Sequence, residues 1–238
     1  MEAIILAGGR GERLGGVSGG RPKPLVPVGG RPLAAYQVVQ LAAAGVPRVV
    51  VSCAAGTGAL FRHALGAIGP EIVPVEEPEP LGRGGGLRLA SEALGEDGPC
   101  FALNGDELVD LDLRALLDRH AATGAAATIA VARPKQQFGV VDLTDDDVVT
   151  GFREADRVPY WVNCGVYVLD DEALALFPEK GDHETTAFPE LAAAGRLRAF
   201  RHEGVWLTVN TPKELRVADE YVREHPERFA VTGSAVAG

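Results

Sequence analysis

The chain has 238 residues, of which 46% are hydrophobic, so it is long enough to bury a sizeable core within one α/β domain. Its net charge of −10 argues against a general nucleic-acid-binding protein, because binding a phosphate backbone requires clustered lysine and arginine side chains. Its apolar runs are too short to cross a bilayer, so we expect no membrane segment.

The first residues and the cysteines indicate a cytoplasmic protein. The start lacks a basic region, and its apolar run is too short for a signal peptide. Cys53, Cys100 and Cys164 lie in or beside apolar runs without the spacing of a metal site. We therefore expect buried free thiols in a reducing compartment.

Short apolar runs alternate with helical patterns through the first half of the chain. Apolar strands without polar alternation, separated by helices, predict a mostly parallel sheet with helices on both faces. The expected strands are 3–7, 48–53, 71–75, 100–103 and 126–132, and the expected helices are 33–44, 58–65, 84–94 and 111–123. Gly45 and Gly124 follow two of these helices and are expected to end them.

The pattern changes after about residue 133. Segments 139–143, 148–152 and 161–169 lie close together with polar turns between them, which predicts a small antiparallel lobe. Helices are expected at 171–177, 185–194 and 212–224, and a strand at 197–202. Because no long linker is present, we interpret residues 1–230 as one domain with halves 1–132 and 133–230, followed by a frayed tail at 231–238. The fold class is α/β, a Rossmann-like three-layer sandwich with a mixed, mostly parallel sheet.

The first expected strand runs directly into a glycine-rich segment. Residues 6–14 read Leu-Ala-Gly-Gly-Arg-Gly-Glu-Arg-Leu, and residues 21–25 read Arg-Pro-Lys-Pro-Leu. Glycines let backbone N–H groups approach a phosphate closely, and Arg13 and Lys23 can stabilise charge on a triphosphate. The segment lacks the lysine spacing of a Walker loop and the third glycine of a dinucleotide fingerprint, so it matches neither motif.

Two further segments carry polar groups with a clear chemical use. Residues 76–86 read Glu-Glu-Pro-Glu-Pro-Leu-Gly-Arg-Gly-Gly-Gly, in which the glycines can let a base lie against the backbone. An expected strand ends in Asn104-Gly105-Asp106, and ligands of open α/β sheets bind at the carboxyl ends of strands. A carboxylate there suits Mg²⁺, which is held by one or two carboxylates together with substrate phosphates.

Together these motifs resemble the sugar-1-phosphate nucleotidyltransferases, the nucleotide-diphospho-sugar pyrophosphorylase superfamily, over about residues 2 to 222. The nearest resemblance is to mannose-1-phosphate and heptose-1-phosphate guanylyltransferases. The resemblance implies the nucleotide-diphospho-sugar transferase fold, a nucleotide half followed by a sugar-phosphate half. It assigns catalysis to Arg13, Lys23 and Asp106, with Asp106 as the Mg²⁺ ligand. It implies nucleotide binding by Leu6, Ala7, Gly8, Gly9, Gly11, Glu77, Gly82 and Asn104.

The second half resembles the sugar-binding part of the same family. Phe138-Gly139-Val140-Val141, Phe152-Arg153-Glu154-Ala155 and Trp161-Val162-Asn163-Cys164-Gly165 match three of its segments. The resemblance implies that Gly139, Glu154, Asn163 and Thr208 contact the sugar phosphate. Two positions depart from the family: Ala155 replaces a lysine that grips the sugar phosphate, and Thr208 replaces a second metal-binding aspartate, for which Asn210 is a candidate substitute.

The expected activity is transfer of a nucleoside monophosphate from a nucleoside triphosphate to a sugar 1-phosphate, releasing pyrophosphate. A carboxylate at Glu77 can accept the two adjacent donors of guanine, which favours GTP. Two alternatives stay open: a non-hexose acceptor such as a cyclitol phosphate, and a non-catalytic paralogue that binds nucleotide-sugars. The sequence is compatible with a homo-oligomer but does not determine one.

Overall fold

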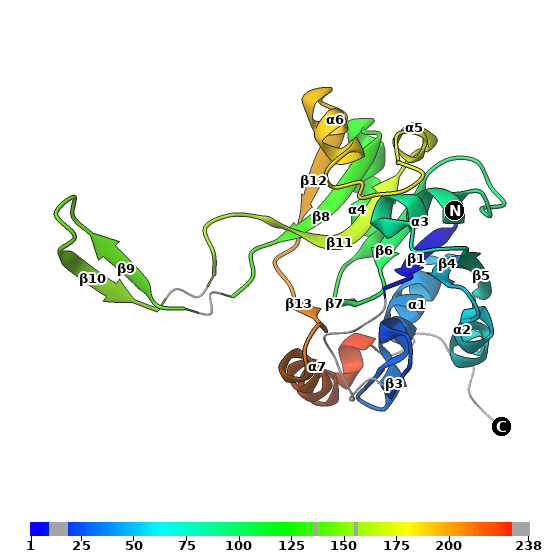
Figure 1. Ribbon diagram of the computed structural model, residues 1–238, viewed down its shortest axis with the longest axis horizontal. Coiled ribbons are helices and arrows are strands. Elements are labelled where there is room, and N and C mark those ends of the chain that lie inside the picture. The colour runs from blue at the N-terminus through cyan, green and yellow to red at the C-terminus, as the bar shows by residue number, and fades with distance from the viewer. Residues whose placement is uncertain (10–18, 136–137, 155–156, 230–238) are drawn as a thin grey trace.

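The computed structural model describes residues 1–9, 19–135, 138–154 and 157–229, and its centre is a seven-stranded sheet (Figure 1). From edge to edge its strands are β12 (Leu197–Arg201), β8 (Ala127–Ala132), β11 (Val162–Leu169), β6 (Cys100–Asn104), β1 (Ala3–Ala7), β4 (Arg48–Ala54) and β5 (Glu71–Glu77). Within this sheet β11 runs antiparallel to both neighbours, and the other paired strands are parallel. The predicted mostly parallel mixed sheet is confirmed.

Helices cover both faces of the sheet, so the predicted three-layer sandwich is confirmed (Figure 1). One apolar core joins the sheet to α1 (Leu33–Ala44), α2 (Gly58–Leu65) and α4 (Leu113–Thr123). The other joins it to α3 (Gly82–Ser91), α5 (Asp171–Ala175) and α6 (Ala187–Ala193). Successive strand residues point to opposite faces, so Ile5 enters the first core and Ile4 the second, both fully buried. Each such side chain stabilises the fold by about 1.5–3 kcal/mol.

Two helices end where the sequence predicted. Gly45 follows α1 with φ 91° and Gly124 follows α4 with φ 56°, and both lie in the left-handed region that disfavours other residues. Among the described residues, no helix has the length and apolar character needed to cross a membrane.

A third, smaller core fastens the C-terminal segments to the carboxyl edge of the sheet. It packs α7 (Pro212–Glu224) and the 3₁₀ turn η3 (Pro226–Phe229) against α1 and the short strand β2 (Pro27–Val28), which pairs with β3 (Arg31–Pro32). Beside it, β13 (Trp206–Thr208) pairs antiparallel with β7 (Glu107–Val109), and the 3₁₀ turn η2 (Lys23–Leu25) precedes β2. These short elements were not predicted from the sequence. They position three residues of the site described below, Lys23, Glu107 and Asn210.

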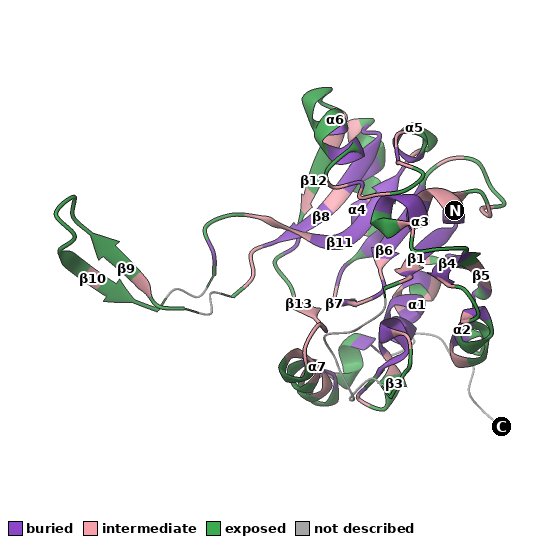
Figure 2. Ribbon diagram, viewed as in Figure 1, coloured by how far each residue is buried: buried purple, intermediate pink, exposed green. Residues whose placement is uncertain are grey.

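The predicted small antiparallel lobe is present as a two-stranded hairpin, but the third segment expected near it lies elsewhere. β9 (Val140–Leu143) and β10 (Val149–Arg153) form a hairpin that projects from the body, whereas β11 lies inside the main sheet (Figure 1). The two segments differ in burial: residues 164–169 of β11 are buried, whereas the hairpin is mostly exposed (Figure 2). A strand without polar positions can be covered only in the interior of the molecule.

Candidate active site

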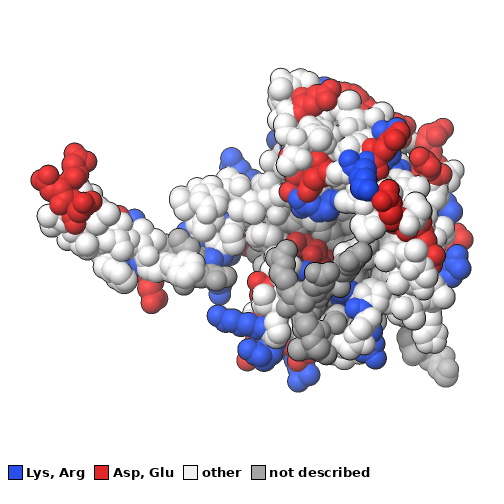
Figure 3. All heavy atoms as spheres, in the orientation of Figure 1, with Lys and Arg blue, Asp and Glu red and all other residues white. Residues whose placement is uncertain are grey.

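A cavity of about 580 Å³ lies at the carboxyl edge of the sheet, where β1 and β6 end beside α3. Figure 3 shows charged side chains of both signs around a hollow near the centre of this face. The cavity is lined by Leu6, Ala7, Gly8, Gly9, Lys23, Pro24, Glu77, Pro80, Gly82, Arg83, Asn104, Asp106, Glu107 and Asn210. The structure thus brings together every residue predicted for nucleotide binding and catalysis except Gly11 and Arg13, which lie outside the described residues.

Lys23 is the centre of the polar contacts in this cavity. Its ammonium group donates to Asp106 Oδ2 at 2.7 Å and to Asn210 Oδ1 at 2.5 Å, and its side chain is largely buried. Lys23 lies on η2, Asp106 follows β6 and Asn210 follows β13, so three distant segments converge on one charge. A buried ammonium held by an ion pair is a fixed positive charge beside the glycine segment, as binding of an anion requires.

Asn210 is held in place by the cap of the helix that follows it. Thr211 and Glu214 form a capping box at the N-terminus of α7, and Glu214 Oε2 also accepts from the backbone N–H of Asn210 at 2.7 Å. Thr208 does not line the cavity; it stands opposite Glu107 in the β7–β13 pair. The side chain that reaches Lys23 is therefore that of Asn210, two residues beyond the predicted position.

Glu107 adds a second carboxyl group beside Asp106. Burial and the neighbouring charge of Asp106 raise the pKa of Glu107 to about 8. Its Oε2 accepts from Trp206 Nε1 at 2.8 Å, which fixes the side chain. The neutral form is thus favoured near pH 7, and Asp106 remains the carboxylate partner of Lys23.

The glycine at position 8 is required by its contact with Glu77. A Cβ added to Gly8 would lie 2.3 Å from Glu77 Oε1, so any larger residue would force the Glu77 carboxylate to move. Glu77 is 6% exposed and accepts from Ser52 Oγ at 2.9 Å and from the backbone N–H of Leu81 at 3.0 Å. Each carboxylate oxygen can accept a second hydrogen bond, so Glu77 retains acceptor capacity toward the cavity.

The glycines of α3 serve a purpose that the sequence did not reveal. A Cβ on Gly84 would lie 2.8 Å from the backbone nitrogen of His183, and one on Gly85 would lie 2.5 Å from the carbonyl oxygen of Glu179. These two glycines therefore let α3 pack against the loop at 178–183, whereas we expected them to accommodate a base. Gly82, which has φ 79° and lines the cavity, stays the candidate for nucleotide contact.

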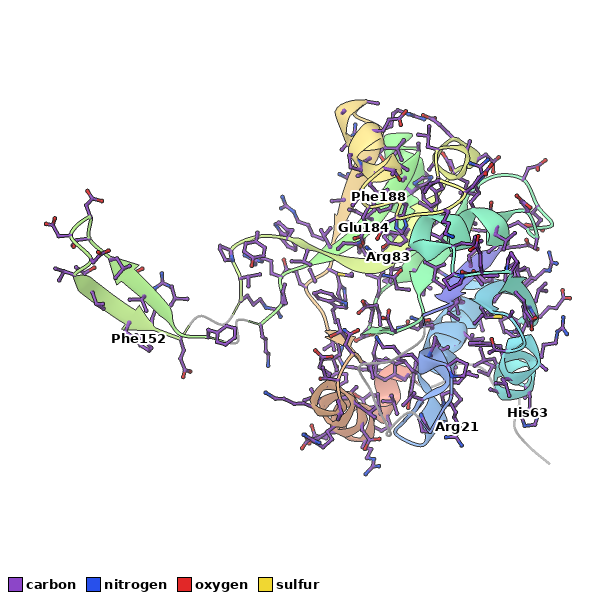
Figure 4. The ribbon with its side chains drawn as sticks, viewed as in Figure 1. Arg21, His63, Arg83, Phe152, Glu184 and Phe188 are labelled. Carbon is purple, nitrogen blue, oxygen red and sulfur yellow. The ribbon has the colours of Figure 1, made fainter. Side chains whose placement is uncertain are left out.

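The predicted acceptor residues are not gathered in the cavity. Gly139 and Glu154 lie exposed at the base of the projecting hairpin, where Figure 4 places Phe152 far from Arg83. Asn163 lies at the start of β11, and its amide nitrogen donates to Tyr167 Oη at 2.8 Å and to Glu184 Oε1 at 2.7 Å. Both amide hydrogens are thus used within the protein. Ala155 lies outside the described residues.

Arg83 has a clear structural role. Arg83 itself lines the cavity, and its guanidinium donates to Asp182 and Glu184 beside it, at distances between 2.5 and 2.9 Å. Figure 4 shows Arg83 and Glu184 side by side. Sequence reasoning missed Asp182 and Glu184, because they lie about a hundred residues after Arg83 in a segment without a motif.

The oxygen atoms around Asp106 fit a magnesium ion that is completed by substrate phosphates. Within the described parts of the chain, no group of three or more acidic, histidine or cysteine side chains could hold a metal by itself. Asp106 supplies one carboxylate, and Asn104 Oδ1, which lines the same cavity, is buried without a hydrogen-bond partner among the described residues. One carboxylate with neutral oxygens and phosphates is a common environment for Mg²⁺.

The cysteines take no part in this chemistry. All three are buried free thiols, as predicted, and burial raises the pKa of Cys100 and of Cys164 to about 12. At neutral pH a thiol with so high a pKa is almost entirely protonated, so it is a poor nucleophile.

Comparison with known proteins agrees with this geometry. The family model for nucleotidyl transferases matches residues 2–225. A mannose-1-phosphate guanyltransferase of Candida albicans is 33% identical over 96% of this chain, and one of Pichia angusta is 35% identical over 90%. The chain spans 68% and 62% of the length of these two relatives.

Two solved structures share the fold. HddC from Yersinia pseudotuberculosis has a TM-score of 0.73 and 23% identity, covering 92% of this chain and 98% of that one. The inositol-1-phosphate CTP transferase of T. maritima has a TM-score of 0.75 and 22% identity, covering 98% of both chains. Given the match of the family model and the identity to the curated relatives, the chain belongs to the nucleotidyl transferase family.

Proposed function

We propose that this chain transfers a nucleoside monophosphate from a nucleoside triphosphate to a sugar 1-phosphate, giving a nucleotide-sugar and pyrophosphate. The observation that carries the proposal is the contact of Lys23 with Asp106 and Asn210 in a cavity that the glycine segment also lines. The relatives named mannose-1-phosphate guanyltransferase support the same reaction class.

The nucleotide would occupy the part of the cavity between β1 and α3. Gly8 and Gly9 line the cavity, and next to Gly9 the described residues leave open space, so phosphate oxygens can approach this part of the backbone closely. Lys23 stands beside this segment and can neutralise charge on the triphosphate and on the leaving pyrophosphate. Gly11 and Arg13 are proposed to extend the same contact.

The reaction needs no general base. The phosphate oxygen of the acceptor is already anionic near pH 7, so it can attack the α-phosphorus directly while the bond to pyrophosphate breaks on the opposite side. The protein then contributes alignment of the two phosphates and compensation of their charge.

Mg²⁺ is proposed to bind at Asp106, with the Asn104 side-chain oxygen nearby and nucleotide phosphates completing the site. A bound Mg²⁺ supplies charge stabilisation for the phosphoryl oxygens. Asp106 would then interact with two cations, the metal and Lys23, which donates to its Oδ2.

GTP is the favoured nucleotide. Glu77 lines the cavity, and its two oxygens can each accept one further hydrogen bond, which matches the adjacent N1–H and 2-amino donors of guanine. Uracil and thymine offer one N–H between two carbonyl groups, and a carboxylate would repel those carbonyl oxygens.

The test is pyrophosphate release measured for each pairing of the four common nucleoside triphosphates with a panel of hexose 1-phosphates, with Mg²⁺ present. We expect release with GTP and at least one hexose 1-phosphate, and its loss on chelation of the metal. Tight nucleotide binding without release in any pairing would favour a non-catalytic paralogue. Release only with a cyclitol phosphate would retain the chemistry and change the acceptor class.

A further inference from the structure

Arg83 links the nucleotide-binding segment to the acceptor side of the cavity. It lies in the first turn of α3 and lines the cavity, directly after Gly82. Its guanidinium uses four hydrogen bonds to hold Asp182 and Glu184, which lie in the loop before α6. Because a guanidinium carries five N–H groups in a fixed plane, these contacts fix the two carboxylates relative to α3.

Glu184 continues this network to Asn163, at the start of β11. Its Oε1 accepts from both Arg83 Nη1, at 2.8 Å, and Asn163 Nδ2, at 2.7 Å. Asn163 Oδ1 accepts from the backbone N–H of Gly165 at 2.9 Å. The amide of Asn163 therefore has no hydrogen left to donate to a ligand, and its position is set by Glu184.

The groups that remain free in this network are oxygen atoms that accept hydrogen bonds. Glu184 Oε2 accepts one hydrogen bond, from Arg83 Nη2 at 2.6 Å, and can accept a second. The side chains of Asp182 and Glu184 are about one-third exposed, so a ligand at the rim can reach them. One positive and two negative charges leave this group with a net charge of −1, which disfavours a phosphate and favours a hydroxyl donor.

We propose that Glu184 is the specificity-determining residue for the acceptor. It accepts a hydrogen bond from a hydroxyl of the sugar 1-phosphate, and Arg83 is a positioning residue that holds Glu184 at the rim. The hydroxyl end of the acceptor then lies at Glu184, and its phosphate is directed toward Lys23, the cation deeper in the cavity. This inference rests on the proposed function and adds the orientation of its second substrate.

The experiment measures binding, so it gives a result even if turnover is slow. Calorimetric titration gives the Kd of a hexose 1-phosphate and of its monodeoxy analogues, with the protein saturated by Mg²⁺ and a non-hydrolysable GTP analogue. For the wild-type chain, we expect one monodeoxy analogue to bind at least about tenfold more weakly than the parent sugar, since a hydrogen bond to a charged group is lost. In Glu184→Gln, the parent sugar should bind about as weakly as that analogue, and the difference between the two should disappear.

Two further variants separate acceptor recognition from general damage. Arg83→Lys keeps the positive charge but loses the planar fork, and should weaken sugar binding while the Kd of the GTP analogue alone changes less than about twofold. Glu79→Gln is the matched control: Glu79 carries an exposed ion pair with Lys180 at 2.8 Å, outside the network, and this substitution should leave both constants unchanged. Thermal unfolding of each variant verifies that it is folded.

Each outcome has a definite meaning. If the wild-type chain binds hexose 1-phosphates and Glu184→Gln binds every analogue equally well, the inference is wrong while the proposed function stands. The inference is also wrong, and the proposed function stands, if Glu184→Gln or Arg83→Lys weakens binding of the GTP analogue as much as binding of the sugar. If the wild-type chain binds the GTP analogue but no hexose 1-phosphate, both the acceptor class in the proposed function and the inference are overturned.

Discussion

The contact of Gly8 with Glu77 gives the most direct prediction, because the structure offers a neighbouring glycine as its control. Gly8→Ala places a methyl group 2.3 Å from Glu77 Oε1, so the carboxylate must move by about 1 Å to reach an ordinary contact distance. That movement breaks or stretches the bonds from Ser52 Oγ and from the Leu81 N–H. A buried charged group that loses a hydrogen bond costs about 1–3 kcal/mol, so we expect the free energy of unfolding to fall by that amount.

The measurement is urea-induced unfolding of the ligand-free protein, with Gly9→Ala beside it. A Cβ at Gly9 meets nothing within 4 Å among the described residues, so that variant should keep the wild-type stability to within about 0.5 kcal/mol or gain slightly through reduced chain entropy. Ser52→Ala removes one of the same two bonds without adding a methyl group, and should lie between them. Equal stabilities for Gly8→Ala and Gly9→Ala would refute the claim that Glu77 is fixed at this position.

Three other predictions follow from contacts in and around the site. Asp106→Asn should lower the rate of pyrophosphate release by about a hundredfold or more, because the carboxylate proposed to hold the Mg²⁺ that neutralises substrate phosphates is lost; near-normal turnover would remove the metal assignment. Burial lowers the pKa of His183 to about 4, so the folded protein resists protonation that the unfolded chain accepts below about pH 6.5. The contribution of His183 to the free energy of unfolding should therefore fall by about 3 kcal/mol as the pH is lowered from 6.5 to 4. Urea titrations across that range should show a smaller decrease in the free energy of unfolding for His183→Phe than for the wild-type chain. Thr211→Ala removes the helix cap next to Asn210 and should cost about 1 kcal/mol in the free energy of unfolding; an unchanged midpoint would contradict the capping box.

The elements with strong local signals could be predicted from the sequence almost to the residue. The strand at 3–7 and the helix at 33–44 agree with β1 and α1, since an unbroken apolar run and a terminal glycine are both local features. The location of β11 could not be predicted in the same way. Its pairing with β6 and β8 depends on contacts with strands far away in the chain, which a local pattern of alternation does not contain.

The same distinction separates the predicted site residues from those that were missed. Lys23, Glu77 and Asp106 follow strands or glycine segments whose chemistry can be recognised locally, and the structure gathers them in one cavity. Glu184 has no such context, and only the folded chain brings it to Arg83. The role of the glycines in α3 could not be predicted from the sequence. A glycine that lets a base approach the backbone cannot be distinguished there from a glycine that lets a loop pack against it.

Residues from both halves of the chain, before and after residue 132, contact one another in and around the site. Asn210, from the end of the chain, holds the ammonium group of Lys23, and Glu184 is bound by Arg83 from the nucleotide side. A fixed position of Lys23 therefore depends on the cap of α7, and a fixed position of Glu184 depends on α3. Binding of nucleotide at α3 would restrain Arg83 and with it the acceptor carboxylates, so the two substrates should bind with positive coupling that Arg83→Lys reduces.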